Sequence, residues 1–237
     1  MATTSQVHTK TTLPSPRKIR SFVRRAGRIT RAQHQALETN WHRFGIDAEN
    51  GPLDFDKIFA RHAQRYLEIG FGMGDGLLEM AQTNPHHDYL GIEVHEPGLG
   101  RLVHGLAKRN ITNVRVIRGD ATEVLATAIT PHSLNGVFLY FPDSWPKKRH
   151  HKRRIVQPDF VARVCTRLVP SGRFELATDW EEYAIYMLQV LEAEPQLRNL
   201  AGPGCFAPRP PHRPLTKFER RGEKLGHPIR DLVFARV

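Results

Sequence analysis

Short apolar runs alternate with stretches of helical periodicity from residue 65 onward. We expect strands at residues 65–69, 88–93, 113–117, 135–140 and 173–178, and helices near 75–83, 96–109, 121–128 and 155–168. A further helix is expected at 181–193, an irregular Gly/Pro-rich loop at 202–214 and a closing strand at 229–237. Alternation of largely apolar strands with helices predicts an α/β fold, in which a mostly parallel sheet carries helices on both faces.

The N-terminal part of the chain lacks this alternation. Residues 1–16 are rich in Thr, Ser and Pro and are predicted to be disordered, and residues 17–37 are basic with scattered apolar side chains. Residues 41–50 are expected to form a turn-rich connection, followed by a short helix at 55–60. We therefore divide the chain into a basic, partly disordered N-terminal arm, residues 1–40, and a single domain, residues 41–237.

The net charge of +11 is concentrated in two places. Residues 1–31 carry eight Lys or Arg and no acid, and residues 147–154 carry six more without an acid. The rest of the chain is mildly acidic, so two basic segments are attached to an acidic body. A single basic tail is as often a solvated tail, but two such segments favour a polyanionic partner, and we expect a nucleic acid.

Composition limits the other function classes. No apolar run reaches the roughly 18–20 residues that a membrane span needs, and the N-terminus shows no secretory signal. Two cysteines without a C-x-x-C pattern suit a reducing cytoplasm. Thirteen histidines include no pair at the spacing of metal ligands, so we expect no metal.

A glycine-rich turn follows the first strand. Gly70, Gly72 and Gly74 lead into the helix near 75–83, which places bare backbone N–H groups and a helix N-terminus beside a ligand, usually a nucleotide or nucleoside. A dinucleotide fingerprint needs Gly or Ala where this chain has Asp75. The turn therefore favours S-adenosylmethionine over a nicotinamide cofactor, although a glycine turn without any ligand has a similar sequence.

Acidic residues stand at or near the carboxyl end of each predicted strand in turn. They are Glu68, Glu93, Asp120, Asp143 and Asp179. Glu93 is placed to accept from ribose hydroxyls, while Asp120 either caps the next helix or binds an adenine amino group. Five acids at one edge of a sheet predict a site that prefers positive charge.

The chain resembles the bacterial tRNA (guanine-N7-)-methyltransferase family. The blocks that carry the resemblance are residues 67–74 (Leu-Glu-Ile-Gly-Phe-Gly-Met-Gly), 91–95 (Gly-Ile-Glu-Val-His), 141–154, 177–180 (Ala-Thr-Asp-Trp) and 216–222 (Thr-Lys-Phe-Glu-Arg-Arg-Gly). The Phe-Pro-Asp-Ser-Trp-Pro stretch with its basic continuation and the Thr-Lys-Phe-Glu stretch are the most specific. The resemblance implies a Rossmann-like class I methyltransferase with an antiparallel C-terminal strand.

The resemblance also implies roles for residues. Glu68, Glu93 and Asp120 join the three glycines as S-adenosylmethionine contacts, and Asp143 belongs to both the cofactor site and the active site. Guanosine and tRNA contacts are implied for Lys147, Arg149, Arg153, Arg154, Asp179, Thr216, Lys217, Phe218 and Glu219. The implied substrate is guanosine 46 in the variable region of tRNA, with the enzyme a monomer or a homodimer.

The chemistry agrees with these roles. Guanine N7 has a free lone pair, so in-line alignment with the methyl donor supplies the rate without a base. Carboxylates such as Asp143 and Asp179 would stabilise the cationic character of the reaction. Asp179 and Glu219 are candidates to read guanine, and Trp145 and Phe218 either stack on bases or belong to the core. Two alternatives stay open: a nicotinamide-dependent oxidoreductase, and a non-catalytic RNA-binding protein with a methyltransferase fold.

Overall fold

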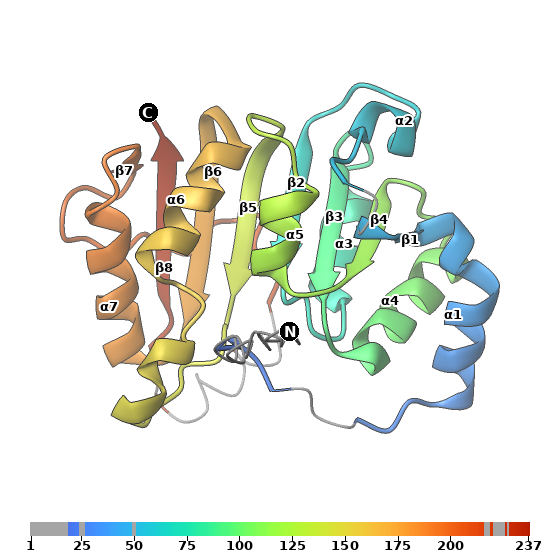
Figure 1. The fold of residues 1–237 in the computed structure, drawn as a ribbon, viewed down its shortest axis with the longest axis horizontal. Coiled ribbons are helices and arrows are strands. Elements are labelled where there is room, and N and C mark those ends of the chain that lie inside the picture. The colour runs from blue at the N-terminus through green and yellow to red at the C-terminus, as the bar shows by residue number, and fades with distance from the viewer. Residues whose placement is uncertain (1–18, 24–26, 49–50, 216–218, 220–225, 227) are drawn as a thin grey trace, which may run out of the picture.

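The computed structural model describes residues 19–23, 27–48, 51–215, 219, 226 and 228–237, and its centre is a single eight-stranded sheet (Figure 1). The strand order is β1-β4-β3-β2-β5-β6-β8-β7. The strands are β1 (Gly45–Ile46), β2 (Arg65–Ile69), β3 (Asp88–Glu93), β4 (Val114–Arg118), β5 (Leu134–Tyr140), β6 (Leu168–Thr178), β7 (Leu197–Asn199) and β8 (Arg230–Arg236). β8 pairs antiparallel with β6 and β7, and the other pairs are parallel. The predicted fold class is confirmed.

Helices cover both faces of the sheet, as predicted. They are α1 (Arg31–Phe44), α2 (Phe55–Phe59), α3 (Asp75–Thr83), α4 (Glu96–Lys108), α5 (Ala121–Thr127), α6 (Pro158–Arg167) and α7 (Glu181–Glu192), with a 3₁₀ helix η2 (Lys148–Arg153). One apolar cluster joins α2, α5, α6 and α7 to one face, and a second joins α1, α3 and α4 to the other. Helices α5 and α6 cross the near face in Figure 1. No described helix is long and apolar enough to cross a membrane.

The order of the strands determines where a ligand can bind. The chain runs outward from β2 through β3 to β4, then returns to place β5 on the other side of β2. The strand order therefore reverses between β2 and β5. In doubly wound sheets the crevice beyond the carboxyl ends of two such strands is the usual ligand site. The glycine-rich turn begins there, because Gly70 directly follows β2.

Helix α1 corrects our expectation for the N-terminal region. Residues 41–44, which we expected in a turn-rich connection, are the last turn of α1, and the helix crosses the arm boundary that we drew at residue 40. A capping box starts it, because Thr30 Oγ1 accepts from Gln33 N and Gln33 Oε1 accepts from Thr30 N. Ala36 and Phe44 are buried. The division into an arm and a domain stays a prediction, and its boundary at residue 40 falls inside α1.

Two further differences lie between β5 and the C-terminus. The helix that we expected at 155–168 begins at Pro158, since residues 148–153 form η2 and a proline fits the first turn of a helix. The short strand β7 was not predicted, because three residues are too few for a periodic pattern. The predicted closing strand is present as β8.

The contact between α1 and α4 gives a test of the fold. A Cβ atom at Gly100 would lie 2.8 Å from the Gln33 backbone oxygen, whereas one at Gly105 would lie 2.6 Å from Cδ1 of Leu78, the end of a flexible side chain. We expect Gly100→Ala to lower the free energy of unfolding by about 1–3 kcal/mol, because α1 must move. Gly105→Ala is the matched control and should change it by less, since Leu78 can rotate. Urea unfolding measures both, and equal effects would show that α1 is not held against α4 in this way.

Candidate functional site

A cavity of about 380 Å³ lies at the carboxyl ends of the central strands. It is lined by Gly70 and Gly72 after β2, by residues 92–95 at the end of β3, by Gly119 and Ala121 after β4, and by residues 139–143 at the end of β5. The structure therefore brings together the turns that follow four successive strands. This is the crevice that the strand order predicts.

The glycine turn fits a ligand. Gly70, Gly72 and Gly74 have φ angles of +71°, +58° and +78°, a region that side-chain-bearing residues rarely adopt. A Cβ atom at Gly70 or Gly72 would meet no described atom within 4 Å, so both face open space. A Cβ at Gly74 would lie 2.8 Å from Cβ of Leu102. Gly70 and Gly72 thus leave room for a ligand, and Gly74 allows the start of α3 to pack on α4.

Glu93 fixes the shape of the turn. Its Oε2 accepts from Gly72 N at 2.9 Å, and its Oε1 accepts from Val94 N at 2.6 Å and His95 N at 2.9 Å. The side chain is buried and lines the cavity. A carboxylate held by three backbone N–H groups keeps further lone pairs for a ligand, which suits the predicted contact with ribose hydroxyls.

Glu68 lies next to this carboxylate but inside the protein. It is 7% exposed, and its Oε2 has no hydrogen-bond partner among the described residues. Burial, and secondarily the charge of Glu93, raises the pKa of Glu68 from 4.5 to about 8. Its side chain does not line the described cavity. A cation that enters beside Glu93 would favour the ionised form of Glu68.

The remaining acids occupy different positions at the same edge. Asp120 is a helix cap, since its Oδ1 accepts from Thr122 N at 2.9 Å and Thr122 Oγ1 at 2.7 Å, and it borders two hollows beside the main cavity. Asp143 is exposed and lines the cavity itself. Asp179 is partly buried after β6 and does not line it. Of the three, only Asp143 combines exposure with a place in the cavity wall.

The loop after β5 has an unusual backbone. Phe141 and Trp145 have φ angles of +52° and +47°, which cost about 1–3 kcal/mol each for residues with a side chain. Arg154 holds this loop from inside. Its Nε donates to Ser144 O at 2.9 Å, its Nη1 donates to Glu182 Oε1 at 3.0 Å, and the side chain is 2% exposed. The loop that carries Asp143 is therefore rigidly supported.

Two of the predicted tRNA contacts have other partners in the structure. Arg154 is buried and bonded to Ser144 and Glu182, so its guanidinium does not lie at the surface, where we expected it to meet an RNA phosphate. Glu219 is 2% exposed, and its carboxylate accepts from Nη1 and Nη2 of Arg213, each at 2.8 Å, so in this structure it is engaged in a buried ion pair. Lys147 and Arg149 are exposed, as expected. Thr216, Lys217 and Phe218 lie outside the described residues.

A segment of the N-terminal region completes the cavity wall, which the sequence did not predict. Ser21, Phe22 and Val23 line the cavity. Trp145 Nε1 donates to Ser21 O at 3.2 Å, and Arg153 donates to Arg20 O at 3.1 Å and Phe22 O at 3.2 Å. The Arg153 guanidinium also lies 3.9 Å from the centroid of the Trp145 ring. The one available signal was the apolar pair Phe22-Val23 within a basic stretch.

The His, Cys, Asp and Glu side chains are dispersed in the described part of the chain. No group of three or more His, Cys, Asp or Glu side chains is placed there to hold a metal ion. The site is instead built from backbone N–H groups, carboxylates and aromatic side chains, a set that suits an organic ligand with a polar sugar and a positive charge.

The buried carboxyl of Glu68 generates a prediction for pH dependence. Because its pKa is 4.5 ordinarily and about 8 in the folded protein, the folded state binds one extra proton between these values. The free energy of unfolding should therefore fall as pH rises through this window, by up to roughly 1.4 kcal/mol per pH unit. Glu68→Gln should remove this fall, whereas Glu79→Gln, on the exposed face of α3, should keep it. Urea unfolding at about pH 5.5 and about pH 8.5 measures the difference. Identical pH slopes in the two variants would contradict the prediction.

Comparison with known proteins places the chain in a family. The family model described as "Putative methyltransferase" matches residues 62–232. Proteins named tRNA (guanine-N(7)-)-methyltransferase from Alkalilimnicola ehrlichii and Ectopseudomonas mendocina are 56% and 53% identical, covering 92% and 93% of this chain and 92% of each relative.

Solved structures agree on the fold. The aminoglycoside resistance methyltransferase NpmB1 has a TM-score of 0.55 at 14% identity, covering 81% of this chain and 94% of that one. The 16S rRNA methyltransferase KamB has a TM-score of 0.56 at 13% identity, covering 77% and 92%. At these identities the likeness concerns the fold alone. The match to the family model and the identity to the curated relatives extend over most of the sequence, and the chain therefore belongs to the tRNA (guanine-N(7)-)-methyltransferase family.

Proposed function

We propose that this chain methylates N7 of guanosine 46 in the variable region of tRNA, in the cytoplasm. The observation that carries the proposal is the position of the Asp143 loop. It forms one wall of the cavity and continues directly into Lys147 and the basic helix η2. A site for the methyl donor thus adjoins a surface suited to the RNA backbone, in a chain whose close relatives are named as tRNA methyltransferases.

S-adenosylmethionine is the cofactor of this methyltransferase family, and it supplies a methyl group on a positively charged sulfur. The residues present fit it. Gly70 and Gly72 leave open space, Glu93 offers acceptors for ribose hydroxyls, and Glu68 adds a buried carboxyl without a described partner. The nicotinamide alternative has no support, because the matching family is a methyltransferase family and Asp75 occupies the third fingerprint position.

The proposed mechanism uses positioning and charge. The lone pair of guanine N7 needs no base, so Asp143 has no proton to remove. Its carboxylate, exposed at the cavity wall, stabilises the positive charge that passes from the donor to the purine. The rigid support of the loop by Arg154 keeps this carboxylate in place. Asp179 is close to the same edge and is proposed to accept from the guanine N1–H and amino groups.

The exposed cations next to this loop are proposed to hold the RNA. Lys147, Lys148, Arg149 and Lys152 are exposed, and Lys or Arg side chains bind phosphates regardless of sequence. Trp145 is partly buried under Arg153, so we propose that a base contacts only the remaining exposed part of its ring. Arg153 is occupied by the carbonyls of the N-terminal segment, and its contact with RNA would follow only after that segment moves.

Asp143→Asn tests the catalytic role. We expect turnover to fall roughly 100-fold or more, because the neutral amide cannot stabilise the developing cation, while binding of S-adenosylhomocysteine and tRNA persists. The assay is methyl transfer from labelled S-adenosylmethionine to unmodified tRNA, followed by mapping of the labelled nucleotide. Asp47→Asn, an exposed acid after β1, is the control. Unchanged turnover would remove Asp143 from the mechanism. Wild-type protein that binds tRNA but transfers no label would favour the non-catalytic alternative.

The surface cations are tested through salt dependence. Replacing Lys147 and Arg149 by Ala should weaken tRNA binding and reduce the slope of log affinity against log salt by roughly one to two, since about two phosphate contacts are lost. Arg154→Leu should leave that slope unchanged and lower the free energy of unfolding, because Arg154 is buried against Glu182. Filter binding at several salt concentrations and urea unfolding separate the two roles. An unchanged slope in the double variant would show that Lys147 and Arg149 are solvated surface cations that do not contact RNA phosphates.

A further inference from the structure

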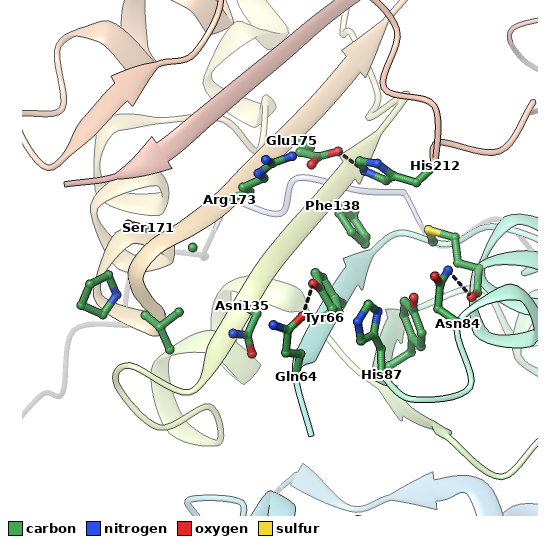
Figure 2. Close-up of a pocket in the computed structure, with 15 residues that line it drawn as sticks. Gln64, Tyr66, Asn84, His87, Asn135, Phe138, Ser171, Arg173, Glu175 and His212 are labelled. Carbon is green, nitrogen blue, oxygen red and sulfur yellow. Dashed lines mark hydrogen bonds and ion pairs between the residues drawn. The ribbon is translucent and has the colours of Figure 1, made fainter. Parts of the chain in front are cut away.

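A second cavity, of about 540 Å³, lies on the face of the sheet that α3 and α4 cover only in part. It is separate from the cofactor cavity, because the two share no lining residue. Its walls come from the amino-terminal parts of β2, β5 and β6 and from the loop that holds His212. Figure 2 shows Arg173, Glu175 and His212 on one side, Gln64, Tyr66 and His87 on the other, and Phe138 between them.

The floor of this cavity is a row of aromatic rings. Tyr89 on β3, Tyr66 on β2 and Phe138 on β5 line the cavity, and Tyr140, also on β5, continues the row toward the first cavity. The planes of consecutive rings are close to parallel. The three centroid distances are 5.7, 5.7 and 5.6 Å, and the angles between planes are 26°, 9° and 12°. Aromatic rings on an open sheet face are a common platform for unstacked nucleobases, because every base has a face that can stack.

Tyr66 is held in its place by its surroundings. A Cβ atom at Gly136 would lie 2.8 Å from Cδ1 of the Tyr66 ring, so the ring lies across the strand at a position that only glycine leaves open. Its hydroxyl donates to Gln64 Oε1 at 2.9 Å. Tyr66 is partly exposed and lines the cavity, whereas Phe138 is 3% exposed. Tyr66 is therefore the ring that a ligand can reach.

Polar groups of fixed orientation surround the rings. Glu175 is 2% exposed, and both of its contacts in the described chain use Oε2: the Tyr140 hydroxyl at 3.3 Å and His212 Nε2 at 2.8 Å. Oε1 thus stays available as an acceptor. Asn135 Oδ1 accepts from Arg65 N at 2.8 Å, and this bond fixes the orientation of the Asn135 side-chain amide. A buried carboxylate beside stacked rings suits a base with adjacent N–H donors, and guanine presents N1–H together with its amino group.

Positive charge at the rim suits the phosphate of a nucleotide. Arg173 is exposed and supplies this charge, while His212, which is bonded to Glu175, lines the cavity beside it. We propose that this cavity binds one guanine nucleotide, stacked on Tyr66 and hydrogen-bonded to Glu175, with its phosphate near Arg173. The nucleotide is either free or an unpaired residue of RNA, and the tRNA source rests on the proposed function above. The site itself depends only on the geometry of the sheet face.

Binding is tested with guanosine 5′-monophosphate and the full-length protein saturated with S-adenosylhomocysteine. In ¹⁵N NMR spectra we expect the amides of Gly136 and Gly172 to shift on titration, because Gly136 lies under Tyr66 and Gly172 lines the cavity. Tyr66→Leu should weaken this binding on the order of tenfold or more, while Tyr66→Phe retains the ring and the affinity. Retained binding of S-adenosylhomocysteine shows that each variant is folded. Shifts confined to Gly70 and Gly119, or no shifts, would overturn the proposal.

The source of the nucleotide is tested by kinetics. If it belongs to tRNA, Arg173→Glu should raise KM for tRNA severalfold with kcat unchanged, and Arg173→Lys should restore it. If the ligand is a free nucleotide, KM for tRNA stays the same while the NMR titration still reports binding. If Tyr66→Leu instead turns a dimer into a monomer and the nucleotide causes no shift, the face is a contact between copies and the proposal is wrong. A protein that transfers no methyl group leaves the NMR test intact, so the two proposals fail separately.

Discussion

Two buried arginines hold the loop on which the site depends. Arg154 lies under the loop that carries Asp143 and bonds Ser144 O and Glu182, while its guanidinium is 4.7 Å from the Tyr183 ring centroid. Arg213 lies 5.8 Å from the Phe141 ring centroid, where the same loop begins. A buried cation is costly unless it is paired, and each arginine is paired with a carboxylate. These pairs offset the strain of the two left-handed residues, Phe141 and Trp145.

Carboxylates set the electrostatic preference of the cavity. Glu93 is held by three backbone N–H groups, and Glu68 is buried beside it with a pKa raised to about 8 by burial. The free energy of unfolding falls at the pH at which Glu68 must ionise, because its buried carboxylate has no counter-charge among the described residues. A positively charged ligand would offset this loss, since it favours the ionised carboxylate. The family's cofactor carries such a charge. The same residues therefore connect the stability of the protein with its choice of ligand.

Sequence patterns predicted the sheet well because strands buried on both faces are continuously apolar, and the glycine turn follows β2 as expected. They failed where a tertiary partner decides the role. Arg154 stands in a run of surface cations, and only its contact with Glu182, 28 residues away in α7, shows that it is structural. Helix α1 was missed because polar side chains outnumber apolar ones in its sequence, although Thr30 and Gln33 form a capping box at its start. The N-terminal wall of the cavity depends on contacts across more than a hundred residues.

The second cavity follows from the handedness of the connections. A crossover between parallel strands is nearly always right-handed, so the direction in which the chain moves along a sheet decides which face receives the helix. The chain moves one way from β2 to β4, which places α3 and α4 on one face, and the other way from β4 through β7, which places α5, α6 and α7 on the opposite face. Of the helices α1 to α7 in the described part of the chain, none therefore lies on the α3 face of β5 and β6. Among the described residues, neighbouring rings and the loop of His212 and Arg213 cover Phe138 and Glu175 there, and Tyr66 and Arg173 line the cavity that remains.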